Sequence, residues 1–190
     1  SQAVLVEGTV AGGTLTFTED AKVTNTAAIT PFEVEEGDAG NKPGLLFINL
    51  HKNVSGEKQL VDGALTIIGE TYQKELKDNN DIQKISNYIG NLSIAFARDG
   101  KRLASDAISI PEDNDVLKVD IQGMETGKYT LEIQAEQLLA EGRSAFLVDK
   151  YLGTETPIQL NGTIYYDYNV TTTDEGSVAP SRFDVVFKQG

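Results

Sequence analysis

The fold is decided by residues 144–188, which read SAFLVDKYLGTETPIQLNGTIYYDYNVTTTDEGSVAPSRFDVVFK. Four apolar or alternating runs stand in this stretch, and residues that favour turns separate them. In residues 163–170 the period is two, which places on one face of a strand Ile164, Tyr166, Tyr168 and Val170. Asn161-Gly162 lies just before this run and is typical of a tight hairpin turn, because both residues tolerate positive φ. The C-terminal third is therefore predicted to be an antiparallel sheet.

The same pattern extends toward both ends of the chain. Residues 182–188 alternate with Phe183, Val185 and Phe187 on the apolar side, and short strand-like runs recur upstream at intervals of roughly 8–12 residues. Helical spacing interrupts the strands in residues 80–90, capped by Asn80 or Asp81, and in residues 135–142. The sequence predicts an all-β fold, an antiparallel β-sandwich of immunoglobulin-like or jelly-roll-like type with one or two short helices.

A chain of 190 residues can form one large β-sandwich or two small ones. The least patterned segments are residues 123–127 and 135–142. We therefore predict an N-terminal lobe over residues 1–125 and a C-terminal sheet lobe over residues 126–190, with one continuous domain as the alternative.

Composition excludes several classes of function. The net charge is −13, and only 16 lysines and arginines are spread along the chain, which disfavours nucleic acids and anionic membrane surfaces as partners. Cysteine is absent, so the chain has no disulfide, thiolate metal site or cysteine nucleophile. No apolar run reaches the length of about 18 residues that membrane insertion requires. The opening residues show no signal-peptide pattern, as expected of a mature or excised fragment.

Asp78, Asn80 and Asp81 form the strongest candidate for a metal site, because closely spaced oxygen ligands suit a hard cation such as Ca²⁺. The segment lacks the glycine and glutamate of an EF-hand loop. The same residue types also cap helices, and capping alone explains them. Further acidic turns stand at residues 112–115 and 174–176, where solvated loops are the simpler interpretation.

Tyr165 is the candidate ligand-binding residue. It lies on the polar face of its strand with Asp167 and Asn169, where an exposed aromatic ring can stack on a sugar. The absence of tryptophan weakens this interpretation. His51, the single histidine, has no second imidazole or cysteine to complete a transition-metal site, so a partly buried or edge histidine is predicted.

A family resemblance covers about three quarters of the chain. Its motifs are DNNDIQK at 78–84, LSIAFARDGKRLASDAISIP at 92–111, GKYTL at 127–131, AFLVD at 145–149, LGT at 152–154, YDY at 166–168 and RFDVVF at 182–187. On these motifs residues 45–187 resemble a module of large secreted surface proteins of the Bacteroidota, adhesin-like chains exported by type IX secretion. The resemblance implies an extracellular, cell-surface location and implies no catalytic residues. The family's C-terminal sorting domain has no counterpart up to Gly190.

These observations predict a non-enzymatic structural or adhesive module of a large bacterial surface protein. Its expected partners are neighbouring modules of the same chain, and surface glycans or proteins. The alternative is a carbohydrate-binding module, with or without calcium, attached to a secreted polysaccharide-degrading enzyme. A hydrolase is disfavoured by the single histidine, the absence of cysteine and the absence of a recognisable nucleophile motif.

Overall fold

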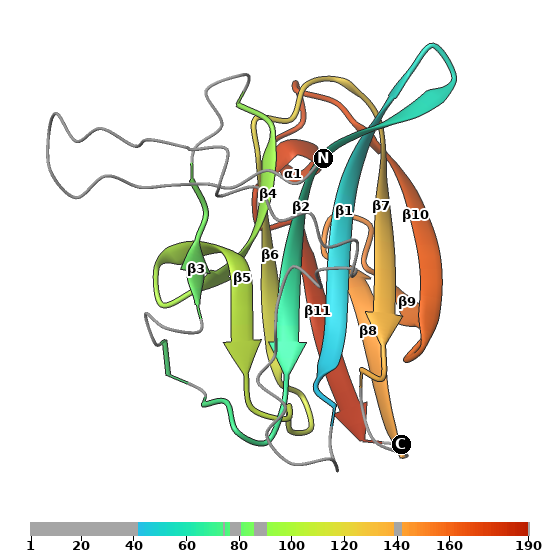
Figure 1. Cartoon of the computed structure of the whole chain (residues 1–190). Coiled ribbons are helices and arrows are strands. Elements are labelled where there is room, and N and C mark those ends of the chain that lie inside the picture. The colour runs from blue at the N-terminus through green and yellow to red at the C-terminus, as the bar shows by residue number, and fades with distance from the viewer. Residues whose placement is uncertain (1–41, 74, 77–80, 86–90, 139–141, 190) are drawn as a thin grey trace, which may run out of the picture. The chain divides into compact units, whose positions relative to one another are not determined.

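Figure 1 shows the computed structural model, which describes residues 42–73, 75–76, 81–85, 91–138 and 142–189. They belong to one compact unit, Asp38–Gly190, while the second unit, Ser1–Gly37, lies outside the described residues together with the strands expected there. In chain order the elements are β1 (Gly44–Val54), β2 (Glu57–Ile68), β3 (Ile82–Gln83), β4 (Ser93–Arg98), β5 (Lys101–Ile108), β6 (Val116–Gln122), β7 (Gly127–Glu136), β8 (Arg143–Asp149), β9 (Thr154–Ile158), β10 (Gly162–Val170), α1 (Glu175–Val178) and β11 (Phe183–Gln189).

The prediction of an all-β fold is confirmed. The strands form one 11-stranded sheet in the order β10-β7-β1-β2-β5-β4-β6-β11-β8-β9, with β3 added beside β5. Every described strand pair is antiparallel except β2 with β5, which run parallel. This parallel pair joins the β10-β7-β1-β2 half of the sheet to the half that contains β6, β11, β8 and β9.

Side chains of the two halves meet in a common core. The ring of Tyr168 on β10 packs edge-on against Phe183 on β11, with 4.9 Å between the ring centroids. The hydroxyl of Tyr166, also on β10, donates to Asp149 at the end of β8 over 2.9 Å. The sheet therefore curls until its first strand in the order contacts the strands at its other end.

Alternation along the strands explains the core. On β1, Leu46, Ile48 and Leu50 are fully buried, and β11 buries Phe183 and Phe187 in the same way. The apolar faces predicted for residues 163–170 and 182–188 are confirmed, because Tyr168, Val170 and the β11 side chains named above all point into this core.

Two local predictions are wrong. Ile82 and Gln83 do not begin a helix; they form β3 and pair with β5, while residues 86–90 lie outside the described residues. Asn161-Gly162 does not close a hairpin either, because β9 pairs with β8 and β10 pairs with β7. The chain crosses there from one half of the sheet to the other, and pairing across the sheet overrides the local turn signal.

The expected lobe boundary between residues 125 and 126 falls inside this sheet. Strand β7, from the expected second lobe, pairs along most of its length with β1, from the expected first lobe. Strand β11 likewise pairs with β6. Strands from both sides of the expected boundary thus pair with each other within residues 44–189.

At other positions the residue types match the local backbone structure that they favour. Asp99 and Gly100 are residue types that accept positive φ; they have φ of 49° and 74° and close the hairpin between β4 and β5. Pro157 lies on β9, an end strand of the sheet, where a missing N–H costs no ladder hydrogen bond.

No helix in the described part of the chain is long and apolar enough to cross a membrane.

Candidate functional site

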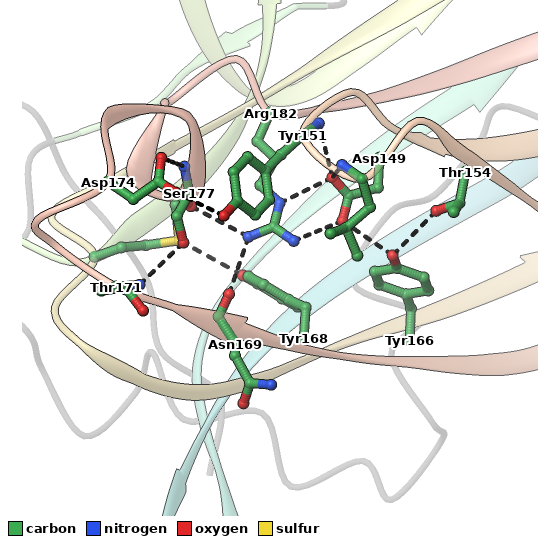
Figure 2. Close-up of polar contacts among 12 residues, drawn as sticks. Asp149, Tyr151, Thr154, Tyr166, Tyr168, Asn169, Thr171, Asp174, Ser177 and Arg182 are labelled. Carbon is green, nitrogen blue, oxygen red and sulfur yellow. Dashed lines mark hydrogen bonds and ion pairs between the residues drawn. The ribbon is translucent and has the colours of Figure 1, made fainter.

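A buried ion pair lies where β8 ends and β11 begins (Figure 2). Arg182 donates to Asp149 through Nε over 2.9 Å and through Nη2 over 2.6 Å, and both side chains are at most 1% exposed. This two-point geometry matches the planar guanidinium to the carboxylate. The pair therefore fixes the turn after β8 against the segment that leads into β11.

Every remaining polar atom of this pair also has a partner. Asp149 accepts hydrogen bonds from the backbone N–H groups of Tyr151 and Leu152 and from the hydroxyl of Tyr166. Burial alone would raise the pKa of Asp149, but the hydrogen bonds from Arg182, Leu152 and Tyr166 hold it below its usual value. Asp149 is therefore ionised in the native state at neutral pH.

Aromatic rings surround the guanidinium. Its central carbon lies 4.8 Å from the ring centroid of Tyr151 and 5.0 Å from those of Tyr168 and Phe183. Nη1 of Arg182 donates to the carbonyl oxygens of Asn169 and Ser177. Because its groups are saturated, this arrangement, which we call the Arg182 anchor, serves structure and leaves no free acid, base or nucleophile.

The anchor extends to the surface through Asp174. The hydroxyl of Tyr151 donates to Oδ2 of Asp174 over 2.7 Å, and Oδ1 accepts from the N–H groups of Gly176 and Ser177. Asp174 is thus the N-cap of α1. Hydrogen bonds from Tyr151, Ser177 and Gly176 lower the pKa of Asp174. This acidic turn, which suggested a solvated loop in the sequence, has a capping role.

We expect Asp174→Ala to reduce the free energy of unfolding by about 1 kcal/mol, because it removes the cap of α1. Glu175→Ala, one residue further on, should change it by less than about 0.5 kcal/mol. Urea unfolding of both variants measures the two effects. Equal effects would show that the carboxylate of Asp174 contributes no specific capping.

The outward side of β10, β7 and β1 forms a second candidate site. Strand register places Tyr165 beside Glu132, Asp167 beside Thr130, and Asn169 beside Lys128. From β1 the adjacent outward residues are Asn49, His51 and Asn53, and Lys58 follows on β2. We call these ten residues the outer polar face.

Tyr165 is 60% exposed on this face, as expected for a residue on the polar side of its strand. The ammonium of Lys58 lies 5.1 Å from its ring centroid and 3.1 Å from a carboxylate oxygen of Asp167. Thr130 donates to the same oxygen over 2.5 Å. Hydrogen bonds from Thr130 and then Lys58 lower the pKa of Asp167, so it is charged at neutral pH.

A depression of about 380 Å³ opens on this face, lined by Asn53, Lys128, Tyr129, Asp167, Tyr168 and Asn169, of which Asp167 lies two residues from Tyr165 on β10. Tyr129 and Tyr168 turn their rings into the core and are at most 4% exposed. The side chains that face solvent are therefore the four polar ones. Arg182 supports this depression from beneath through the carbonyl of Asn169 and the ring of Tyr168.

His51 is engaged on the same face. Its Nε2 lies 2.7 Å from a carboxylate oxygen of Glu132, and the two side chains are 14% and 22% exposed. The prediction of a partly buried histidine is confirmed. Its partner comes from β7, 81 residues away, so no local sequence pattern could have indicated this pair.

The predicted metal ligands are only partly covered by the structure. Asp78 and Asn80 lie outside the described residues, so the calcium site stays a prediction. Asp81 is 9% exposed, and its Oδ1 accepts from Nη2 of Arg98 over 2.8 Å and from the N–H of Ala107 over 2.9 Å. Within residues 42–189, apart from the gaps, no cluster of three His, Asp or Glu side chains is arranged to hold a metal ion.

Arg98 also pairs with Asp106, at 2.5 Å, so two buried carboxylates share one guanidinium. Burial raises the pKa of Asp106 to about 6; Arg98 opposes this shift and Asp81 adds to it. The sequence offered no signal for this arrangement because Asp81, Arg98 and Asp106 come from three separate segments. A carboxyl group with a raised pKa inside the fold makes stability depend on pH.

The fold and these sites define the class of protein as an all-β domain with a saturated buried anchor and an exposed polar face. Comparison with models of protein families, with curated proteins and with solved structures found no match. The sites themselves are therefore the guide to what the protein does.

Proposed function

We propose that this chain is a non-enzymatic extracellular module of a large bacterial surface protein, and that it acts by adhesion through its outer polar face. The observation that carries the proposal is that the exposed ring of Tyr165 lies on the same face as the polar depression. Binding sites commonly combine an exposed aromatic residue with a few convergent polar groups. The family resemblance of residues 45–187 supports the location.

The scaffold suits presentation of a ligand-binding face. We propose that the curled sheet is a β-sandwich, in which β10-β7-β1-β2 pack on β6-β11-β8-β9. The Arg182 anchor holds the inner side of β10 through Asn169 and Tyr168, and these residues line the depression. A surface supported in this way is ordered before it meets a ligand, which lowers the entropic cost of binding.

A second candidate, a carbohydrate-binding module attached to a polysaccharide-degrading enzyme, is favoured by the chemistry of the face. An exposed tyrosine ring stacks on the apolar side of a sugar, while amide and carboxylate groups pair with its hydroxyls. Tyr165 supplies the ring, and Asn53, Asp167 and Asn169 supply the polar groups. Both candidate functions use the outer polar face. They differ in the larger protein to which the module belongs, a surface protein or a polysaccharide-degrading enzyme.

A binding screen tests the proposal. We expect the chain to bind a member of a panel of immobilised glycans and surface proteins, and Tyr165→Ala to weaken that binding about tenfold or more. The stability of this variant should stay within about 0.5 kcal/mol of wild type, because the ring is on the surface. Biolayer interferometry and urea unfolding measure the two quantities.

Leu152→Ala is the matched control, since Leu152 is 56% exposed on the turn between β8 and β9, outside the outer polar face. It should leave binding unchanged. Binding that survives Tyr165→Ala but is lost in Leu152→Ala would move the adhesive surface to that turn. A wild-type chain that binds nothing on the panel would refute the adhesive function.

A further inference from the structure

Lys128 supplies a positive charge to the wall of the depression on the outer polar face. The chain as a whole has a net charge of −13, and Asp167, the carboxylate that lines the depression, forms an ion pair with Lys58 at 3.1 Å. Lys128 also lines the depression, and no carboxylate of the described residues forms an ion pair with it. Among the described residues that line the depression, Lys128 is therefore the charged side chain that stands outside an ion pair.

Strand register fixes the surroundings of Lys128. It stands on β7 between Asn53 of β1 and Asn169 of β10, so the lysine is flanked by two carboxamides in one row. The amide nitrogen of Asn53 points to the hydroxyl of Thr130, at 3.5 Å, which orients this side chain. An ammonium between two amides is a set of donors suited to a carboxylate.

We propose that the ligand of the outer polar face is an acidic glycan, whose sugar rings carry carboxylates, and that Lys128 binds one of these carboxylates. The proposal rests on the glycan-binding function proposed above and names its substrate class. Tyr165 stacks on one sugar ring, and Lys128 pairs with the carboxylate of another sugar. The ammonium of Lys58 offsets the negative charge of Asp167, and Thr130 donates to the same carboxylate oxygen.

Two polymers with one backbone test this proposal directly. Polygalacturonate carries a carboxylate on each ring, and its fully methyl-esterified form carries none. We expect the wild-type chain to bind polygalacturonate at least about tenfold more tightly, because a charge-assisted hydrogen bond is stronger than a neutral one. Added NaCl should narrow this difference, since the lysine is exposed to solvent.

Lys128→Met keeps the length of the side chain and removes its charge, so it should bind both polymers with the affinity that wild type has for the ester. Lys118→Met is the control, because Lys118 is an exposed lysine on β6, away from the depression. This control variant should still bind polygalacturonate more tightly than its methyl ester, as the wild-type chain is expected to do. Isothermal titration calorimetry gives these affinities.

The possible results distinguish the acidic-glycan inference from the glycan-binding function on which it rests. Equal affinity for the two polymers, reduced in Tyr165→Ala, would overturn the acidic-glycan inference and keep the glycan-binding function. A preference for polygalacturonate that survives Lys128→Met would overturn the role of Lys128. Failure of wild type to bind either polymer or any other glycan would overturn both the inference and the glycan-binding function.

Discussion

Arg182→Met is expected to lower the free energy of unfolding by about 3–5 kcal/mol, the largest effect of any single substitution considered for this protein. The variant leaves Asp149 charged and completely buried, without the two hydrogen bonds that Arg182 donates to it. The carbonyl oxygens of Asn169 and Ser177 lose a donor in addition. Urea unfolding followed by circular dichroism measures the loss.

The exposed pair formed by Lys188 and Glu155 is the matched control. Its side chains are 37% and 49% exposed, so Lys188→Met should cost less than about 1 kcal/mol. If Lys188→Met and Arg182→Met reduce the free energy of unfolding by the same amount, burial does not determine how much the Arg182 anchor stabilises the protein.

A double-mutant cycle isolates the ion pair itself. Asp149→Asn keeps an oxygen acceptor for the N–H groups of Tyr151 and Leu152 while it removes the charge. In combination with Arg182→Met it should destabilise the protein by less than the sum of the two single changes, because no unpaired buried charge remains. Strict additivity would contradict a direct interaction between the two charges.

Asp106 should make stability depend on pH in the opposite sense to an ordinary salt-bridged carboxylate. Burial raises its native pKa to about 6, from 3.8. Between these values the native state keeps a proton that the unfolded chain has released, so stability falls as pH rises from about 4 to about 6. A difference of about two pKa units corresponds to at most about 3 kcal/mol.

Asp106→Asn removes this titration. We expect the free energy of unfolding of wild type to fall relative to this variant by about 2 kcal/mol between pH 4 and pH 6.5, and then to level off. Comparison with the variant cancels other groups, such as Asp149 and Asp167, whose lowered pKa values give the opposite slope in more acidic solution. Urea midpoints across this range provide the measurement.

Glu57→Gln is the control for that experiment, because Glu57 is an exposed carboxylate at the start of β2. Its stability should follow that of wild type at each pH. Parallel curves for wild type and Asp106→Asn would show that the carboxyl group of Asp106 has the same pKa in the folded and unfolded states.

Much of the local structure followed from the sequence because period-two alternation is a local property. Burial of Tyr168, Phe183 and Phe187 could be predicted from alternation alone, and so could the exposure of Tyr165. The hairpin at Asp99-Gly100 followed from two residues that accept positive φ. These features depend on neighbours within a few positions, and the sequence contains those neighbours directly.

The order of the strands in the sheet was decided by the tertiary structure. Asn161-Gly162 has the chemistry of a hairpin, yet the strands on either side pair with β8 and β7 instead of with each other. Residues 82 and 83 carry a helical pattern but add to the edge of β5. Local preferences of about 1 kcal/mol are overridden where the sheet offers both hydrogen bonds and burial.

The sequence by itself determined an all-β protein with a polar strand face that carries Tyr165, because residue periodicity fixes which side chains share a face. Only the tertiary structure brought Arg182 to Asp149, Arg98 to Asp81 and Asp106, and Lys128 between Asn53 and Asn169. Each of these groups joins segments distant in the chain. Charge pairing has no period in sequence, so its partners become known only when the sheet is assembled.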